Sequence, residues 1–257
     1  SVTGIAQSSK PILPLRFEHI AEKDGLSNNT VDEILCDSRG FMWFGTDDGL
    51  NVYDGTAFST YRHSIIDTNA IAGNNISSIA EDKNNMLWVG AHCSGLSTLN
   101  PFSKKYFNYF ADGSAASITS SCDLDIVFDA NQNLWVCNRG ALSVLNKDHK
   151  TFRHFFPFAA KENNLIYRIA IDKNTIWLSH ANGVKSFDIL TKKFTGYEYL
   201  VDSNTCGNIK VIADHKLLVS TWEHGLYIVN PVIGKSIQLL NNITCTDATI
   251  VRSEERR

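Results

Sequence analysis

Five short clusters of polar and aromatic residues carry side chains that could bind or transform a ligand. They are Asp47-Asp48, His92-Cys93-Ser94, Asn138-Arg139, His180-Ala181-Asn182 and Trp222-Glu223-His224. The clusters follow one another at similar intervals, yet each offers a different set of hydrogen-bonding groups, as a recognition surface requires. The candidate ligand-binding residues are therefore Asp47, Asp48, His92, Asn138, Arg139, His180, Asn182, Trp222, Glu223 and His224.

The sequence lacks the motifs that would make these clusters catalytic. The chain has no G-x-S-x-G nucleophile motif, no H-E-x-x-H zinc motif and no glycine-rich phosphate loop. The adjacent carboxylates of Asp47 and Asp48 could act as a pair, but neighbouring side chains in a turn usually point apart. His92, His180 and His224 could converge on a metal, but their loops are not all neighbours. We therefore predict no catalytic residues, no metal site and no cofactor.

Binding fits the clusters better. Trp222 offers a flat apolar face beside the polar Glu223 and His224, the combination that sugar rings use. The alternative is that Trp222 packs against a neighbouring loop. Arg139 could hold the carboxylate or sulfate of an acidic sugar in a bidentate contact, or it could be solvated.

A tryptophan repeat shows which elements position these clusters. Trp43, Trp88, Trp135 and Trp177 are separated by 45, 47 and 42 residues, and each stands in a similar segment that begins with an aspartate. A fifth segment begins at Asp214. Alignment of its Gly225 with Gly183 puts Val219 in the tryptophan position and moves Trp222 into a loop.

Each repeat contains four short β-rich runs separated by turn residues. The first runs of the five repeats are residues 31–36, 76–80, 124–128, 166–171 and 209–213, and the aromatic fourth runs of the first four include 58–61 and 106–110. Four antiparallel strands in roughly 44 residues predict a blade of a β-propeller. In a blade, the loop between the second and third strands lies on the same face as the connection to the next blade, so the polar clusters share one face. Each tryptophan is expected to fill the wedge between two blades.

The prediction is an all-β propeller of five full blades plus partial strands. The blade units lie near residues 28–61, 74–110, 123–156, 164–199 and 207–240; residues 245–257 start a sixth unit within a propeller region of 15–257, after a flexible segment of 1–14. Residues 15–20 resemble a fourth strand without the rest of its blade. We expect the chain to be a fragment of a longer propeller.

Two motifs resemble a known repeat. They are Gly25-Leu26-Ser27-Asn28-Asn29-x-Val31 and Asp37-x-x-Gly40-x-x-Trp43-x-Gly45-Thr46-x-x-Gly49-Leu50, and they are similar to the two-component regulator propeller repeat. That repeat occurs in periplasmic sensor regions of hybrid two-component histidine kinases of Bacteroides-like bacteria. The third unit departs from it with Cys137-Asn138 in place of Gly-Thr, and the fifth lacks the tryptophan.

The resemblance implies a non-catalytic, periplasmic sensor module from a seven-bladed propeller. It implies an oligosaccharide ligand, the rest of the sensor kinase and a homodimer as partners, and carbohydrate sensing as the function. Two alternatives remain open: a propeller enzyme similar to the streptogramin lyases, and a protein-interaction scaffold similar to WD-repeat proteins.

Composition excludes several other classes. The 257 residues include 24 Lys and Arg against 27 Asp and Glu, for a net charge of −3, which disfavours binding to nucleic acid or to anionic membranes. No apolar run approaches the roughly 18 residues that span a bilayer. Six cysteines are scattered singly and are expected to be mostly small buried residues; their spacing does not require a disulfide.

Overall fold

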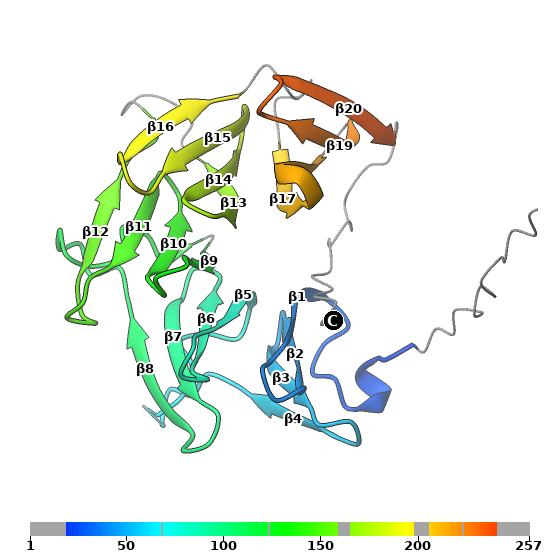
Figure 1. Ribbon diagram of the computed structural model, residues 1–257. Helices are drawn as coiled ribbons and strands as arrows, with labels where there is room; N and C mark the ends of the chain where they lie inside the picture. Colours follow the sequence, from blue (N-terminus) through cyan, green and yellow to red (C-terminus); the bar gives the residue numbers. More distant parts are fainter. Residues whose placement is uncertain are drawn as a thin grey trace, which may run out of the picture.

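The repeats form five antiparallel sheets of four strands each, so the predicted β-propeller is confirmed. The computed structural model describes residues 19–67, 69–122, 124–158, 165–197, 206–222 and 224–240. Figure 1 shows the five sheets, blades one to five, following one another around a ring in chain order. The first strand of each blade lies innermost, where it packs beside the first strand of the next blade. The predicted segments 1–14 and 245–257 and residues 15–18 lie outside the described residues.

The strand bounds agree with the predicted runs to within a few residues. The strands are β1 (Val31–Cys36), β2 (Met42–Thr46), β3 (Gly49–Tyr53) and β4 (Phe58–Tyr61); β5 (Ile76–Glu81), β6 (Leu87–Ala91), β7 (Gly95–Asn100) and β8 (Lys105–Tyr109); β9 (Asp125–Phe128), β10 (Leu134–Asn138), β11 (Ala141–Leu145) and β12 (Phe152–Phe155); β13 (Ile166–Asp172), β14 (Thr175–His180), β15 (Gly183–Asp188) and β16 (Lys193–Gly196); β17 (Cys206–Ile212), β18 (Lys216–Thr221), β19 (Gly225–Asn230) and β20 (Lys235–Leu240). The largest difference is at β17, which begins at Cys206, three residues before the predicted run. It ends at Ile212, where Ala213–His215 forms a 3-10 turn.

The aspartate that opens each repeated segment organises the turn between the first and second strands. In blade three, Asp129 Oδ1 accepts the backbone N–H groups of Asn131 and Asn133, both at 2.9 Å. Its Oδ2 accepts the indole N–H of Trp135 at 3.0 Å. The same bonds recur in blade one, where Trp43 donates to Asp37 at 3.0 Å. The spacing of six residues between aspartate and tryptophan therefore lets one carboxylate close the turn and satisfy the buried indole.

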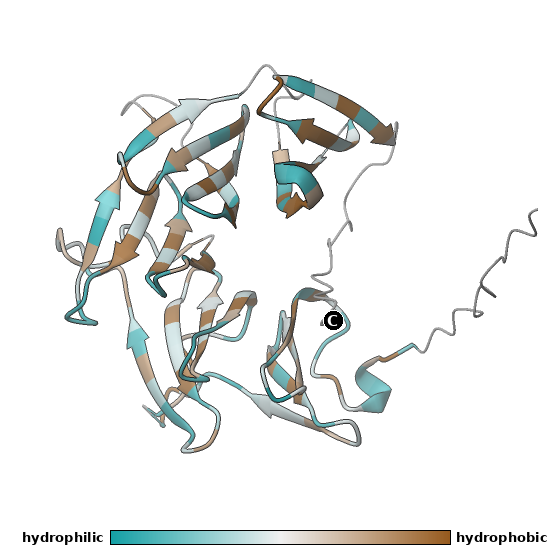
Figure 2. Cartoon of the chain, viewed as in Figure 1, coloured by the Kyte–Doolittle hydropathy of each residue, from teal (hydrophilic) through white to brown (hydrophobic). Residues whose placement is uncertain are grey.

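Each tryptophan packs against the following blade, as predicted. Trp43 belongs to a buried cluster with Ile79, Leu87 and Val89 of blade two. Trp88, Trp135 and Trp177 make equivalent clusters with blades three, four and five. All four are at most 7% exposed. Figure 2 shows hydrophobic residues recurring along the strands of every blade, which is where these inter-blade clusters lie.

The glycine two residues after the tryptophan lets neighbouring blades approach closely. A Cβ atom on Gly45 would lie 2.8 Å from Ile76 Cγ2 and 3.0 Å from the Ile76 carbonyl oxygen. A Cβ atom on Gly90 would likewise lie 3.1 Å from Leu124 Cβ of the next blade, and it would also clash with Ser78 Oγ of its own blade. Blades one and two therefore need glycine here because backbone and side chains of the next inner strand occupy the space.

The segments that lead into blades two and three fold across the third and fourth strands of those blades. In blade two, the N–H of Ala72 donates to Ser97 Oγ at 2.8 Å, and Asn108 Nδ2 donates to the carbonyl of Ala70 at 2.9 Å. Ile71 and Ile118, which occupy matching places before blades two and three, are each 1% exposed. These connections are therefore fixed parts of the blades.

The register of blade five corrects the predicted tryptophan equivalent. In blade four, Trp177 pairs with Ser186, which is the third residue after Gly183. In blade five, the third residue after Gly225 is Ile228, and it pairs with Leu218, so Leu218 is the equivalent of the tryptophan. Val219, which the alignment favoured, points to the opposite side and packs with Trp177 of blade four. The alignment was wrong by one residue because the loop of blade five is one residue longer. Trp222 does lie in that loop, as predicted.

The cysteines differ partly from expectation. Cys137 and Cys206 are buried as expected, whereas Cys36 is exposed. Cys93 and Cys122 form a disulfide that the spacing did not predict. It ties the β6–β7 turn to the connection that leads into blade three; Cys245 lies outside the described residues. No helix in the described part of the chain is long and apolar enough to cross a membrane.

Candidate functional site

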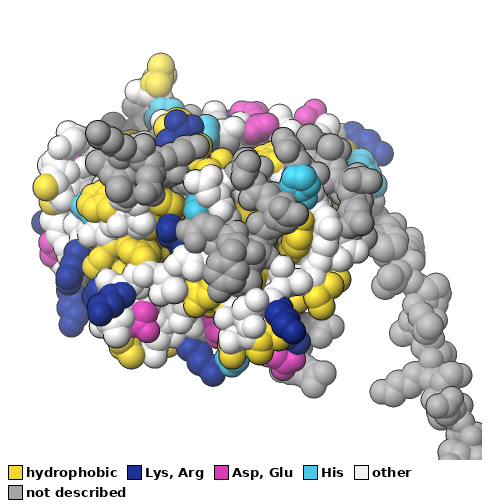
Figure 3. Space-filling model, turned by 90° about the horizontal axis from the view of Figure 1, so that it is seen from above, with side chains coloured by type: hydrophobic (Ala, Val, Ile, Leu, Met, Phe, Trp, Pro, Cys, Tyr) yellow, Lys and Arg dark blue, Asp and Glu magenta, His cyan; other side chains and the backbone are white. Residues whose placement is uncertain are grey.

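The predicted clusters lie on one face of the ring, which we call the loop face. It carries the β2–β3, β6–β7, β10–β11, β14–β15 and β18–β19 turns and the connections between blades. The exposed candidates are Asp47, His92, Arg139, Asn182, Trp222 and His224, and Asp48 is partly exposed. Glu223 lies outside the described residues. Figure 3 views the ring from its edge, where basic, acidic and hydrophobic side chains are interspersed.

Two of the predicted residues, Asn138 and His180, are buried. Asn138 Oδ1 accepts a hydrogen bond from Thr119 Oγ1 at 2.6 Å, and its Nδ2 donates to the carbonyl of Ser120 at 3.1 Å. His180 Nδ1 accepts the N–H of Asn182 at 3.2 Å, and its ring packs edge-on against Phe158. Both are the last residue of the second strand, where the side chain turns inward to hold the loop. The expectation that they are presented on the surface was wrong.

The adjacent carboxylates of blade one serve different partners. Asp47 Oδ1 accepts a hydrogen bond from Asn75 Nδ2 at 2.7 Å. Asp48 Oδ2 forms an ion pair with Arg62 Nη2 at 2.9 Å, and both side chains are about half exposed. The two residues therefore anchor the connection to blade two from two points and do not form a catalytic carboxylate pair.

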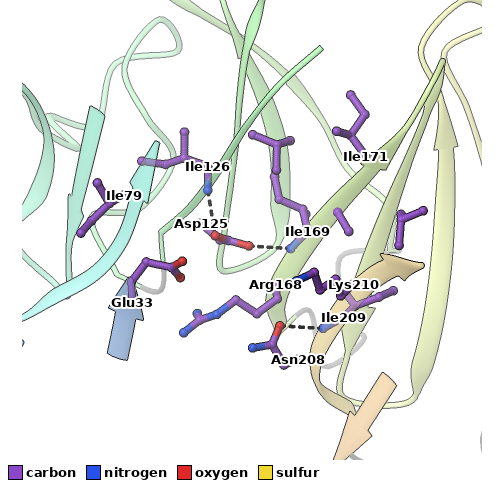
Figure 4. A pocket seen from close by; sticks show the side chains of 13 residues that line it. Glu33, Ile79, Asp125, Ile126, Arg168, Ile169, Ile171, Asn208, Ile209 and Lys210 are labelled. Atoms are coloured by element: carbon purple, nitrogen blue, oxygen red, sulfur yellow. Dashed lines mark hydrogen bonds between the residues drawn. The ribbon is translucent and has the colours of Figure 1, made fainter. Parts of the chain in front are cut away.

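A cavity of ≈ 300 Å³ lies among the inner strands, at the centre of the ring. Its polar lining includes Glu33 of β1, Asp125 of β9, Arg168 of β13 and Asn208 of β17 (Figure 4). Asp125 is held in place, because its Oδ2 accepts the N–H of Ile169 at 2.7 Å. The cavity thus combines acidic, basic and amide groups above apolar isoleucines.

Sequence reasoning missed the residues that line this central cavity, which we call the channel, although the sequence contains a signal for them. Every inner strand has a polar residue directly before an isoleucine: Glu33, Ser78, Asp125, Arg168 and Asn208 precede Ile34, Ile79, Ile126, Ile169 and Ile209. In blades one, two and four the pairing with the second strand shifts register just before the polar residue. In blade five the shift comes just before the isoleucine. A β-bulge re-aims the side chain next to it, so Glu33, Arg168 and Asn208 turn toward the channel while the strand stays paired; Ser78 is buried and does not line the channel.

Asp32 and Arg168 connect the channel to the loop face electrostatically. Burial raises the pKa of Asp32, and the Asp47 carboxylate raises it further. The charges of Arg168 and His92 lower the same pKa. Charged groups from blades one, two and four therefore act on one carboxyl at this edge of the channel.

Trp222 leans toward the channel from blade five. Its indole is 47% exposed, and its Nε1 atom lies 3.7 Å from the place that a Cβ on Gly207 of the inner strand would take. The neighbouring turn is closed by the N–H of His224, which donates to Thr221 Oγ1 at 3.0 Å. An exposed aromatic face thus lies beside the inner strand β17.

One serine–histidine pair resembles a nucleophile and its base. Ser143 Oγ lies 2.8 Å from His154 Nδ1, and His154 Nε2 lies 3.1 Å from the carbonyl oxygen of Ala115. Ser143 is fully buried, so no substrate can reach it. The pair occupies the cross-strand position that Ser97 and Asn108 fill in blade two, and it holds the incoming connection.

Comparison with known proteins confirms the predicted resemblance. The two-component regulator propeller repeat matches residues 25–48 and 70–92, which cover the incoming segment, the aspartate turn and the tryptophan of blades one and two. A stretch of 56 residues is 41% identical to Histidine kinase P4 of Formosa agariphila. That stretch is 22% of this chain and 4% of the kinase.

Solved structures share the fold. The extracellular domain of a hybrid two-component system from B. thetaiotaomicron aligns with a TM-score of 0.55 and 23% identity, over 88% of this chain and 37% of that one. A catalytically inactive virginiamycin B lyase from Staphylococcus aureus with quinupristin aligns with a TM-score of 0.65 and 10% identity, over 82% of this chain and 71% of that one. At these identities the likeness establishes the propeller fold and does not choose between sensing and catalysis.

Proposed function

We propose that this chain is a non-catalytic sensor propeller of a hybrid two-component system, which lies in the periplasm and binds an oligosaccharide on its loop face. The observation that supports this most directly is the two-component regulator propeller repeat in blades one and two. The match to part of a histidine kinase points to the same class of protein. The kinase domains would belong to the rest of the full-length protein.

The disulfide supports the location. Cys93 and Cys122 are 29 residues apart and join two loop-face segments. Disulfides persist in oxidising compartments, including the bacterial periplasm, and are rare in the cytosol. A periplasmic location would also expose the loop face to carbohydrate that has entered the periplasm.

The channel mouth has the groups that an oligosaccharide needs. The exposed indole of Trp222 can stack on the C–H face of a sugar ring, and the side chains of Asp32 and Arg168 can accept and donate hydrogen bonds to hydroxyl groups. Arg139 on the β10–β11 turn of blade three would hold the carboxylate or sulfate of an acidic sugar. Ligand binding would transmit a signal by favouring one arrangement of a homodimeric sensor, which requires different affinities for the two arrangements.

The test is calorimetric titration of the chain with a panel of neutral and acidic oligosaccharides. Trp222→Ala should weaken binding by about tenfold, which corresponds to the ~1.4 kcal/mol expected from loss of aromatic contact. Phe102→Ala is the matched control, since Phe102 is 69% exposed but lies in a turn on the opposite face. Binding of no oligosaccharide, or chemical conversion of one, would refute the proposal; conversion would favour the lyase-like alternative.

A further inference from the structure

A second cavity opens on the opposite face of the ring, between blades two and three. It has a volume of ≈ 420 Å³, within the range of roughly 300–1,000 Å³ that is common for small-molecule sites. Three turns surround it: the β5–β6 turn with Asp82, the β9–β10 turn with Asn131, and the β11–β12 turn with His149. We call this cavity the turn-face pocket. None of the predicted loop-face residues lines it.

The turns around the pocket are tied together by hydrogen bonds. The N–H of Lys83 donates to Gln132 Oε1 at 3.1 Å, which joins the turns of blades two and three. Tyr109 Oη donates to the carbonyl of His149 at 2.9 Å, which anchors the third turn to β8. Trp88 and Phe128 form an apolar wall below them. The pocket is therefore a preformed space with polar edges and an apolar base.

Asp82, at the edge of the pocket, has fewer side-chain hydrogen-bond partners than the equivalent aspartates of blades one and three. In blade one, Asp37 Oδ2 accepts both Trp43 Nε1 and the guanidinium of Arg39. In blade three, Asp129 Oδ2 accepts both the indole of its tryptophan and Asn133 Nδ2.

Among the described residues, Asp82 Oδ2 receives a single hydrogen bond, which comes from Trp88 Nε1 at the long distance of 3.4 Å. Asn84 and Met86 stand where blades one and three have the second donors, and neither side chain donates to Asp82 in the described structure. A carboxylate oxygen at the edge of the pocket thus keeps capacity to accept a hydrogen bond from a ligand.

The remaining groups define the chemistry of that ligand. The side-chain amides of Asn84 and Asn131 line the pocket and have no hydrogen-bond partner among the described residues, so each can both donate and accept. Lys83 and Lys147 add hydrogen-bond donors, and Asp82 adds an acceptor, so the lining can pair with both the O–H groups and the oxygens of a ligand. Amides, one carboxylate and an apolar wall together suit a neutral, polyhydroxylated ring.

We propose that the turn-face pocket binds a neutral saccharide of one or two rings, with hydroxyl groups donating to Asp82 and exchanging hydrogen bonds with Asn84 and Asn131. The pocket lies on the face opposite the loop-face site, so it is an additional site. Its occupancy can be measured separately from that of the loop-face site.

The experiment is NMR titration of the whole chain with four neutral disaccharides: maltose, cellobiose, lactose and xylobiose. The indole N–H resonance of Trp88, assigned with Trp88→Phe, should shift in a saturable way with at least one of them. Because Trp222 reports on the loop face, a shift confined to its indole would support the proposed function and refute the turn-face pocket. The absence of a saturable Trp88 shift with all four sugars would also refute the pocket.

Two pocket variants and a control test whether the asparagine side chains at the edge of the pocket contribute to binding. Asn131→Ala and Asn84→Ala should each weaken the binding measured at Trp88 by about 3- to 10-fold, since each removes a hydrogen-bonding group from an exposed turn. Asn174→Ala is the control, because Asn174 is an exposed asparagine in the equivalent β13–β14 turn outside the pocket. Unchanged binding in both pocket variants, or equal weakening in the control, would overturn the proposal.

Discussion

The bond between the turn aspartate and the buried tryptophan should contribute strongly to stability where it exists. In blade three, Asp129 is 4% exposed and Trp135 is 1% exposed, so Asp129→Ala leaves the indole N–H without an acceptor and without water. An unsatisfied buried donor costs about 1–3 kcal/mol, and loss of the turn bonds adds to it. We expect the free energy of unfolding to fall by about 3 kcal/mol and Tm to fall by roughly 6–12 °C.

Blade four supplies a matched control for this prediction. There the aspartate precedes the tryptophan by five residues, and Trp177 Nε1 has no hydrogen-bond partner among the described residues. Asp172 instead accepts His215 Nδ1 at 2.6 Å near the surface. Asp172→Ala should therefore cost about 1 kcal/mol or less, since it removes one hydrogen bond near the surface.

The assay is urea unfolding followed by circular dichroism, with Asp129→Ala, Trp135→Phe and the double variant. Trp135→Phe removes the indole N–H, so Asp129→Ala should cost less in that background than in the wild type. The difference should be about 1–2 kcal/mol if the two groups interact as the structure shows. Equal costs for Asp129→Ala and Asp172→Ala, or no coupling between Asp129 and Trp135, would refute the reasoning.

Two further predictions concern packing and pH. Gly45→Ala should destabilise the chain by about 1–3 kcal/mol in urea unfolding, since its Cβ would lie 2.8 Å from Ile76. Gly207→Ala should cost less, because its Cβ would lie 3.3 Å from the nearest atom. Equal costs for the two variants would contradict the role of close blade packing. Burial tends to raise the pKa of Asp37 and Asp129, but hydrogen bonds from the indoles and turns outweigh it and lower both below the ordinary value. Their contribution to stability is present above roughly pH 4 and is lost as the pH falls through the pKa of the folded state. The midpoint of urea unfolding should therefore drop between about pH 5 and pH 2. A midpoint that stays constant over this range would show that these carboxylates do not stabilise the fold.

The fold could be predicted from the sequence because the features that build a blade are local and repeated. Trp88 and the aspartate before it lie within one hairpin, so their spacing is visible in the chain. The disulfide and the burial of His180 could not be predicted in this way. Cys93 meets Cys122 only because the connection into blade three folds back over the blade, and such long-range contacts leave no periodic signal.

The candidate site was harder to predict than the fold for a related reason. Loop residues such as Asn138 stand out by type, but a side chain at the last position of a strand points inward once the turn is formed. Arg168 stands inside a β-rich run and was read as part of a strand, although its position beside a register shift directs it to the channel. Pairing irregularities of this kind depend on the partner strand, which a single sequence does not display.

The same division between repeated and varied positions explains how one scaffold can support two different surfaces. Aspartate and tryptophan recur because each satisfies the other inside a blade, whereas the second side-chain partner of the aspartate differs. It is Arg39 in blade one and Asn133 in blade three, and among the described residues no second side chain donates to Asp82 Oδ2 in blade two. The turn still forms in blade two, because Asp82 Oδ1 accepts two backbone N–H groups at 2.8 and 3.0 Å. Loss of the second side-chain partner therefore leaves the fold intact and leaves a carboxylate oxygen at a cavity edge. A position that the repeat does not need for folding is one where a binding function can arise at little cost in stability.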